Sequence, residues 1–154
     1  MTIISQPPLG RREATVVALA AKHRLQIPWV KIAETLQRSL VWSTSAVLGQ
    51  QPLNAEQANV LGKLLELDKV VVAALQLPPI RGAEQVDITE PVVYRLQEMV
   101  QVYGNTLAEL IREEFGDGIM SAIDFELSFE RREDPKGDRV RLVLDGKFLP
   151  YRVF

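Results

Sequence analysis

The sequence predicts an α+β protein, with a helical bundle and linker over residues 1–87 and a helix-plus-antiparallel-strand domain over residues 88–154. Two observations predict this class. Apolar residues recur at helical spacing throughout the first half. From Ile119 onward the stretch GIMSAIDFELSFE alternates between apolar and polar residues, the period of a half-buried strand. Residues 78–90, with two prolines and a glycine and no periodicity, are interpreted as the linker.

The first half begins with two longer helical segments. Residues 12–25 are alanine-rich and carry an apolar stripe formed by Val16, Val17, Ala20 and Ala21. Residues 27–40 repeat this spacing with Val30, Ala33, Leu36 and Leu40. Both patterns are typical of helices that pack in a bundle.

Three shorter helices follow. Residues 42–50 end at Gly49, where a left-handed C-cap has little steric cost. Asn54 is a favourable N-cap for the next helix, and Gln57 stands where a capping box needs it. The segment VVVAALQL closes the bundle before Pro78.

The second half is predicted to contain two helices and two strands. Thr89 is predicted to cap a helix that has Pro91 in its first turn. This helix is predicted to end at Gly104. Another helix runs from near Thr106 to Gly116. The alternating strand, a charged turn and a second strand with Val140, Leu142 and Leu144 facing inward come next, and Asp145-Gly146 forms a further turn.

So small a domain cannot bury much apolar surface alone. We therefore expect obligate oligomerisation, with strands pairing across subunits.

The composition bounds the class of protein. Apolar residues make up 47% and charged residues 25% of the 154 residues, as in soluble globular proteins. The absence of cysteine excludes disulfides and thiolate chemistry. The sequence contains no membrane span and its first residues do not resemble a signal peptide, so we expect a cytoplasmic protein. A net charge of −2 argues against a general nucleic-acid binder.

Ser121 is anomalous because it stands among apolar residues on the inward face of the predicted strand. A buried hydroxyl costs free energy unless it is hydrogen-bonded. Either it bonds to nearby backbone or it has a function. A nucleophilic serine needs a base, and the only histidine, His23, stands among residues with the character of a surface.

Arg95 and Glu98 are a second candidate pair. At about 100° per residue the two lie roughly 60° apart on one shoulder of the stripe Val92, Leu96, Met99 and Tyr103. They either meet a common target at the edge of an interface or form an ordinary surface ion pair.

Other candidate sites are weaker. The sequence GDG at 116–118 lacks the spacing of a phosphate-binding loop, and a helix end with a turn explains it better. No metal site is predicted, because Glu113 and Glu114 suit a solvated helix face. Residues 31–50 resemble a helix-turn-helix, so a DNA-binding regulator is the alternative function, although no basic residue occurs between Arg38 and Lys63.

Residues 94–127 resemble the catalytic segment of the cyanases, also called cyanate hydratases or cyanate lyases. The shared pattern comprises YR, EM, QVYG, TL, FGDGI and SAI, beginning at Tyr94 and ending at Ile123. LDGKFLP at 144–150 and LGQQPL at 48–53 also match the family, whose N-terminal half is a repressor-like bundle. The linker departs most, since GAEQVDITEP differs and the cysteine that some members carry is absent.

The resemblance implies bicarbonate-dependent decomposition of cyanate to ammonia and carbon dioxide through carbamate. It implies no metal or organic cofactor, with bicarbonate as co-substrate, and a homodecamer of five dimers with sites shared among subunits. The family's catalytic residues fall on Arg95, Glu98 and Ser121. The rival classes are the DNA-binding regulator and a non-catalytic oligomeric scaffold.

Overall fold

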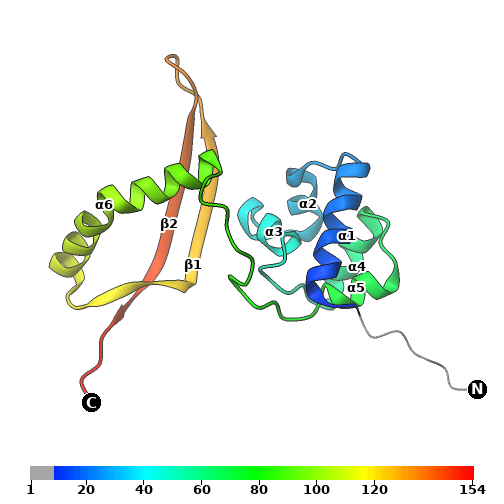
Figure 1. Ribbon diagram of the computed structural model, residues 1–154, viewed down its shortest axis with the longest axis horizontal. Helices are drawn as coiled ribbons and strands as arrows, with labels where there is room; N and C mark the ends of the chain where they lie inside the picture. Colours follow the sequence, from blue (N-terminus) through cyan, green and yellow to red (C-terminus); the bar gives the residue numbers. More distant parts are fainter. Residues whose placement is uncertain (1–8) are drawn as a thin grey trace, which may run out of the picture. The chain divides into compact units, whose positions relative to one another are not determined.

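The computed structural model describes residues 9–154, which divide into two compact units, one up to Ala83 and one from Glu84 onward. The first is helical and the second combines one helix with a β-hairpin (Figure 1). The α+β class predicted from the sequence is confirmed. None of the helices in the described part of the chain is long and apolar enough to cross a membrane.

The first unit contains five helices in the predicted order. They are α1 Arg11–Arg24, α2 Trp29–Leu36, α3 Leu40–Val47, α4 Ala55–Leu64 and α5 Lys69–Ala74. The predicted capping box is present, since Asn54 Oδ1 accepts from Gln57 N at 2.8 Å and Gln57 Oε1 accepts from Asn54 N at 3.0 Å. Gly49 has a φ of +91°, as expected just beyond the end of α3.

Helix α1 buries a face that shares only Ala21 with the predicted stripe. Its buried apolar residues are Ala14, Ala18 and Ala21, whereas Val16 is 63% exposed and Val17 is also exposed. Small side chains at this spacing let the neighbouring helices approach closely, so close packing selects the alanines rather than the most apolar residues. In α2 the predicted Ala33 and Leu36 are buried together with Ile32, whereas Val30 is exposed.

Arg11 is one of two buried charged residues of this bundle, the other being Lys22. Its guanidinium donates to Thr15 Oγ1 at 2.6 Å and to the carbonyl oxygens of Ala46 and Gln51. Arg11 therefore ties the start of α1 to the end of α3 and the loop that follows. Burial lowers the pKa of this guanidinium from its ordinary value.

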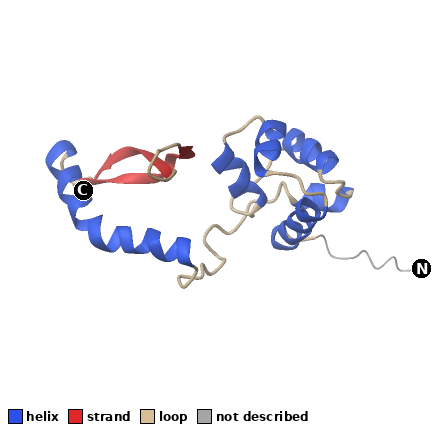
Figure 2. Ribbon diagram, turned by 90° about the horizontal axis from the view of Figure 1, so that it is seen from above, coloured by secondary structure: helices blue, strands red, loops and turns tan. Residues whose placement is uncertain are grey.

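The second unit begins with a single helix, α6 Pro91–Phe115, which bends along its length (Figures 1 and 2). The prediction of two helices separated at Gly104 is wrong. One glycine inside a helix costs only about 1 kcal/mol relative to alanine, and α6 continues through Gly104 over 25 residues. Gly104 is half-buried, and so are Val93, Ala108 and Ile111, in place of the predicted stripe.

The cap of α6 also differs from the prediction. Glu90 is the N-cap, and its carboxylate accepts from Val93 N at 2.9 Å. Thr89 instead donates both its N–H and its hydroxyl to Asp87 Oδ1. The predicted Pro91 in the first turn and the end at Gly116, with a φ of +94°, are correct.

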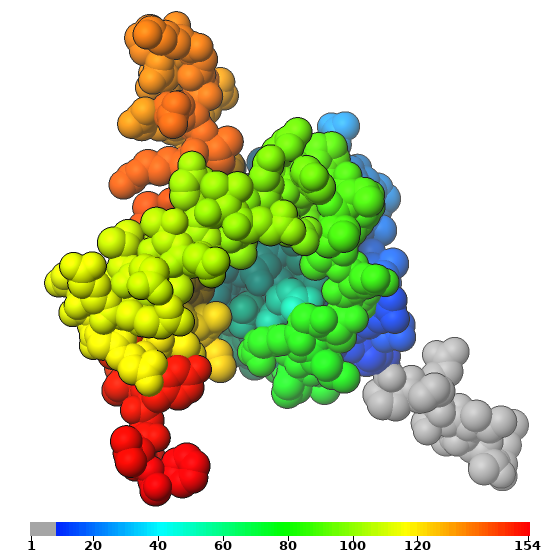
Figure 3. Space-filling model, turned by 60° about the vertical axis from the view of Figure 1, so that its left-hand side comes forward, coloured from blue at the N-terminus to red at the C-terminus, as the bar shows by residue number. Residues whose placement is uncertain are grey.

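The hairpin pairs strand β1 Gly118–Arg132 antiparallel to β2 Arg139–Pro150. Its charged tip projects beyond α6 (Figures 1 and 3). The predicted turn at Asp145-Gly146 is wrong, because both residues lie inside β2 and pair with Glu126 and Phe125. Phe115 stacks on Phe148 with ring centroids 5.2 Å apart, which holds the end of α6 against the hairpin.

Ser121 is the only buried residue between Glu84 and Phe154, all of which the structure describes. The stripe predicted to be buried on α6 is exposed in the single chain, including Val92, Leu96, Met99 and Tyr103. Exposed apolar surface of this extent is typical of an interaction face. The described pairing of β1 with β2 lies within one chain, and strand pairing between subunits stays a prediction.

Candidate active site

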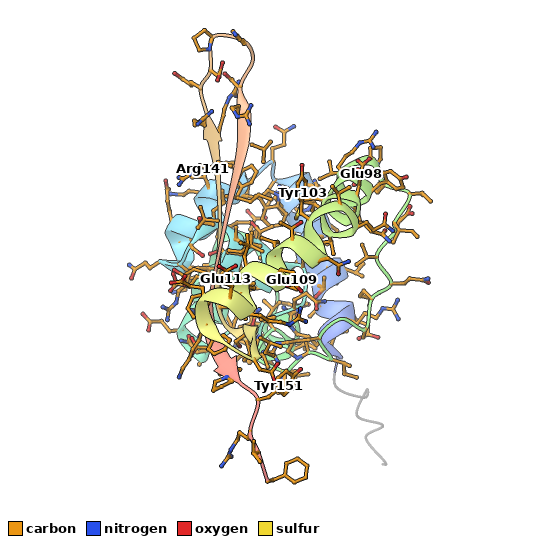
Figure 4. The ribbon with its side chains drawn as sticks, turned by 90° about the vertical axis from the view of Figure 1, so that its left-hand side faces the viewer. Glu98, Tyr103, Glu109, Glu113, Arg141 and Tyr151 are labelled. Atoms are coloured by element: carbon orange, nitrogen blue, oxygen red, sulfur yellow. The ribbon has the colours of Figure 1, made fainter. Side chains whose placement is uncertain are left out.

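Arg95 and Glu98 meet on the first half of α6. Arg95 Nη1 lies 3.0 Å from Glu98 Oε2, one helical turn away, and the two side chains are 71% and 52% exposed. Figure 4 shows Glu98 on this part of the helix, followed by Tyr103, Glu109 and Glu113. The spacing predicted from the sequence therefore brings the two charges into direct contact.

The ring of Tyr94 gives the Arg95 guanidinium a second contact. The guanidinium carbon lies 5.4 Å from the ring centroid, within the range of a cation–π interaction. Arg95 is thus oriented by a carboxylate and an aromatic face, and most of its surface remains open. A guanidinium with free donors in this position can bind a small anion through two parallel hydrogen bonds.

Ser121 lies in a large β-bulge. Met120 pairs with Phe148, but the next pair in the register is Phe125 with Gly146, so residues 121–124 lie opposite the single residue Lys147. The bulge interrupts the alternation that the sequence predicted through this stretch. Ile123, expected to face inward, is 98% exposed, while Phe125 and Leu127 beyond the bulge are half-buried.

The bulge also explains how the buried hydroxyl of Ser121 is accommodated in the hairpin. Ser121 is 5% exposed, and its Oγ accepts the backbone N–H groups of Ile123 at 3.1 Å and Asp124 at 2.9 Å. The hydroxyl is therefore satisfied by nearby backbone, which was one of the two interpretations of the sequence. This bonding does not exclude a second role, because the hydroxyl hydrogen is not used in it.

The structure brings together two of the three predicted site residues. No hydrogen bond or ion pair among the described residues joins Ser121 to Arg95 or Glu98. All three belong to the same compact unit. The geometry of one chain thus presents an exposed ion pair on the helix and a hydrogen-bonded serine on the hairpin.

The remaining candidates are placed elsewhere. His23 is exposed on α1, in the other unit. Within residues 9–154 no group of three or more histidine, aspartate or glutamate side chains is placed to hold a metal ion. Gly146 was predicted to lie in a turn, but it lies inside β2, where its backbone passes close to the backbone of Ser121. A glycine within a strand pattern is a known sign of such a close approach, and this sign was available in the sequence.

Comparison with known proteins identifies the class. The family model described as "Cyanate lyase C-terminal domain" matches residues 85–153, and "Cyanate hydratase, N-terminal" matches residues 11–79. Curated relatives named cyanate hydratase include one from Ralstonia pickettii, 49% identical over 95% of this chain and 100% of the relative. Another, from Thiobacillus denitrificans, is 48% identical with the same coverage.

A solved structure agrees with these relatives. The crystal structure of cyanase from T. urticae superposes with a TM-score of 0.79 and 36% sequence identity, covering 89% of this chain and 96% of that chain. Fold and relatives together define an enzyme of the lyase class rather than a DNA-binding regulator. Within that class, the chain belongs to the cyanate hydratase (cyanase) family.

Proposed function

We propose that this enzyme joins cyanate to bicarbonate. The bicarbonate oxygen attacks the cyanate carbon, one proton is taken up, and the adduct divides into carbon dioxide and carbamate. Carbamate then takes up a second proton and breaks down to ammonia and another carbon dioxide. The names of the relatives support cyanate as the substrate of this chain; bicarbonate, carbamate and a detoxifying role are inferences from the family resemblance.

The observation that carries the proposal is the exposed Arg95–Glu98 ion pair. Both proposed substrates are anions, so they repel each other and must lose water before they react. A guanidinium is permanently charged and offers forked donors to carboxylate-like oxygens. Arg95 is proposed to offset the combined negative charge as the two anions approach.

Glu98 is proposed to hold Arg95 in the orientation that the reaction needs. A carboxylate at 3.0 Å from Nη1 fixes one edge of the guanidinium and leaves its other donors for the anions.

Ser121 is proposed as a binding and orienting hydroxyl, not a covalent nucleophile. The hydrogen bonds of its Oγ come from the backbone N–H groups of Ile123 and Asp124, and neither partner is a general base. Its hydroxyl hydrogen remains available to an anion. Much of the acceleration would then come from holding two reactants together in a site shielded from water.

We further propose that the enzyme assembles as a homo-oligomer, a decamer of five dimers, with each site shared among subunits. Two features support a shared site: Ser121 makes no hydrogen bond to Arg95 or Glu98 within one chain, and the apolar stripe of α6 lacks cover. No metal or organic cofactor is part of this proposal. A cytoplasmic location stays a prediction from the sequence.

The test is ammonia release from cyanate by the purified oligomer, with and without added bicarbonate, and in the presence of a chelator. We expect release that depends on bicarbonate and survives the chelator. An assembled oligomer that releases no ammonia under either condition would contradict the proposed reaction. If the chelator stopped ammonia release, cyanate would still be the substrate, but the proposal of a reaction without a metal cofactor would be refuted.

A further inference from the structure

The hydroxyl of Ser121 can make one further hydrogen bond, as a donor through its hydrogen. A serine oxygen has two acceptor sites, and the N–H groups of Ile123 and Asp124 occupy both. A nucleophilic attack needs a free lone pair, whereas hydrogen-bond donation to an anion needs only the proton. The bulge therefore limits Ser121 to donation, provided that the bulge keeps its shape.

Gly146 is the residue on β2 that permits this shape. It pairs with Phe125, directly after the bulge. A β carbon at Gly146 would lie 2.4 Å from the carbonyl oxygen of Ser121 and 2.5 Å from Met120 Cγ, closer than β carbons approach other atoms in proteins. Its φ is not in the left-handed region, so space rather than backbone conformation excludes a side chain here.

We propose that Gly146 is a positioning residue of the active site. Because it lacks a side chain, β2 reaches the Ser121 backbone, the bulge closes over the two N–H groups, and the hydroxyl of Ser121 is held as a donor to a substrate anion. Gly146 itself touches no substrate. This inference rests on the proposed function of Ser121 and adds the residue that sets the direction of its hydroxyl.

A side chain at Gly146 has a predictable effect. The added β carbon would lie 2.4 Å from the carbonyl oxygen of Ser121, whereas ordinary van der Waals contact begins at 3.4 Å. The two must therefore separate by about 1 Å, and the hydrogen bonds from Ile123 and Asp124 lengthen with this movement. A misplacement on the order of 1 Å of a group that positions a substrate lowers turnover about 100-fold. We expect that loss in Gly146→Ala, with the oligomer still assembled.

The experiment compares the wild type, Gly146→Ala, Ser121→Ala and the control Gly118→Ala. The control is matched because its added β carbon would lie 2.4 Å from the carbonyl oxygen of Leu149 and 2.5 Å from the ring of Phe148 in the same hairpin, outside the bulge. Ammonia release gives kcat and KM, and hydrogen exchange followed by mass spectrometry reports on the amides of the bulge, residues 121–124. Gly146→Ala and Ser121→Ala should both accelerate exchange in this segment, and Gly118→Ala should not.

Two results in assembled enzyme would overturn the inference: near-normal turnover in Gly146→Ala, or lost turnover with unchanged exchange in residues 121–124. If Gly146→Ala does not assemble, Met120→Ala is added, which leaves the Ser121 carbonyl as the nearest obstacle to the new methyl group. Failure of both variants to assemble would also overturn it, since the glycine would then serve the whole fold. If the wild type released no ammonia, the proposed reaction would fail, while the exchange data would still test the bulge.

Discussion

Arg95 Nη1 and Glu98 Oε2 lie 3.0 Å apart although both side chains are more than half exposed. An exposed pair of this kind contributes only about 0.2–1 kcal/mol to folding. The same helix carries a second pair at the same spacing, Arg112 with Glu109 at 3.2 Å. The two pairs are therefore expected to contribute similarly to stability. Replacing a residue of each pair in turn and measuring activity distinguishes a catalytic role from a structural one.

Glu98→Gln is expected to lower kcat by at least about tenfold with an unchanged melting temperature, because a neutral amide holds the Arg95 guanidinium weakly and cannot carry a proton at neutral pH. Steady-state ammonia release and thermal unfolding measure the two effects. Glu109→Gln is the matched control and should retain full activity. Equal activity in the two variants would place Glu98 among ordinary surface carboxylates.

Arg95→Lys tests the forked geometry against the charge. Lysine keeps the positive charge but offers a single ammonium group instead of two parallel donors. We expect a loss of about 100-fold or more in kcat/KM, comparable to removing one preorganised donor from a transition state. Arg112→Lys serves as the control. Retained activity in Arg95→Lys would mean that the charge alone suffices.

Ser121→Ala is expected to abolish ammonia release while the oligomer remains assembled. The change removes the hydroxyl hydrogen proposed for the anion and also leaves the N–H groups of Ile123 and Asp124 without their acceptor. Because both hydrogen bonds are only partly buried, that second loss costs less stability than the roughly 1–3 kcal/mol of a fully buried unpaired group. Ser128→Ala, on the exposed part of the same strand, should change neither property. Near-normal turnover in Ser121→Ala would make the serine a purely structural residue.

The sequence was sufficient for features that depend on local chemistry. The capping box of Asn54 and Gln57, the glycine ends at Gly49 and Gly116, and the contact between Arg95 and Glu98 all involve residues within a few positions of each other. Helical geometry and the requirement to satisfy terminal N–H groups decide such features without knowledge of the rest of the chain.

The sequence was insufficient where distant segments compete for space. The period-two pattern predicted an uninterrupted strand, but the bulge at residues 121–124 depends on how β2 passes Gly146. The choice of alanines over valines as the buried face of α1 depends on how closely neighbouring helices approach. Gly104 was predicted to end a helix because of its low local propensity, but α6 continues through it to Phe115.

Asn54→Ala tests the helical unit separately from the site. The change removes an acceptor for the Gln57 N–H and disrupts the capping box of α4. Replacement of such an N-cap by alanine costs about 1 kcal/mol. We expect a lower melting temperature with unchanged kcat for assembled enzyme, measured by calorimetry and ammonia release. Asn54→Asp should retain most of the stability. A melting temperature that alanine leaves unchanged would show that α4 is held by packing alone.

The segment before α6 provides a prediction about pH. The Thr89 hydroxyl donates to Asp87 Oδ1 at 2.6 Å and the Thr89 N–H donates at 2.9 Å, and these bonds lower the pKa of the Asp87 carboxyl from its ordinary value. A carboxyl whose pKa is lower in the folded state stabilises the fold above its unfolded pKa. This contribution is lost as the pH falls through the lower folded value. Thr89→Ala removes the first of the two bonds, so the Asp87 pKa should rise toward the ordinary value, whereas Thr89→Ser should leave it low. Titration of the Asp87 carboxyl by nuclear magnetic resonance measures the change. An identical midpoint in the wild type and Thr89→Ala would show that the Thr89 hydroxyl does not stabilise the ionised carboxylate of Asp87.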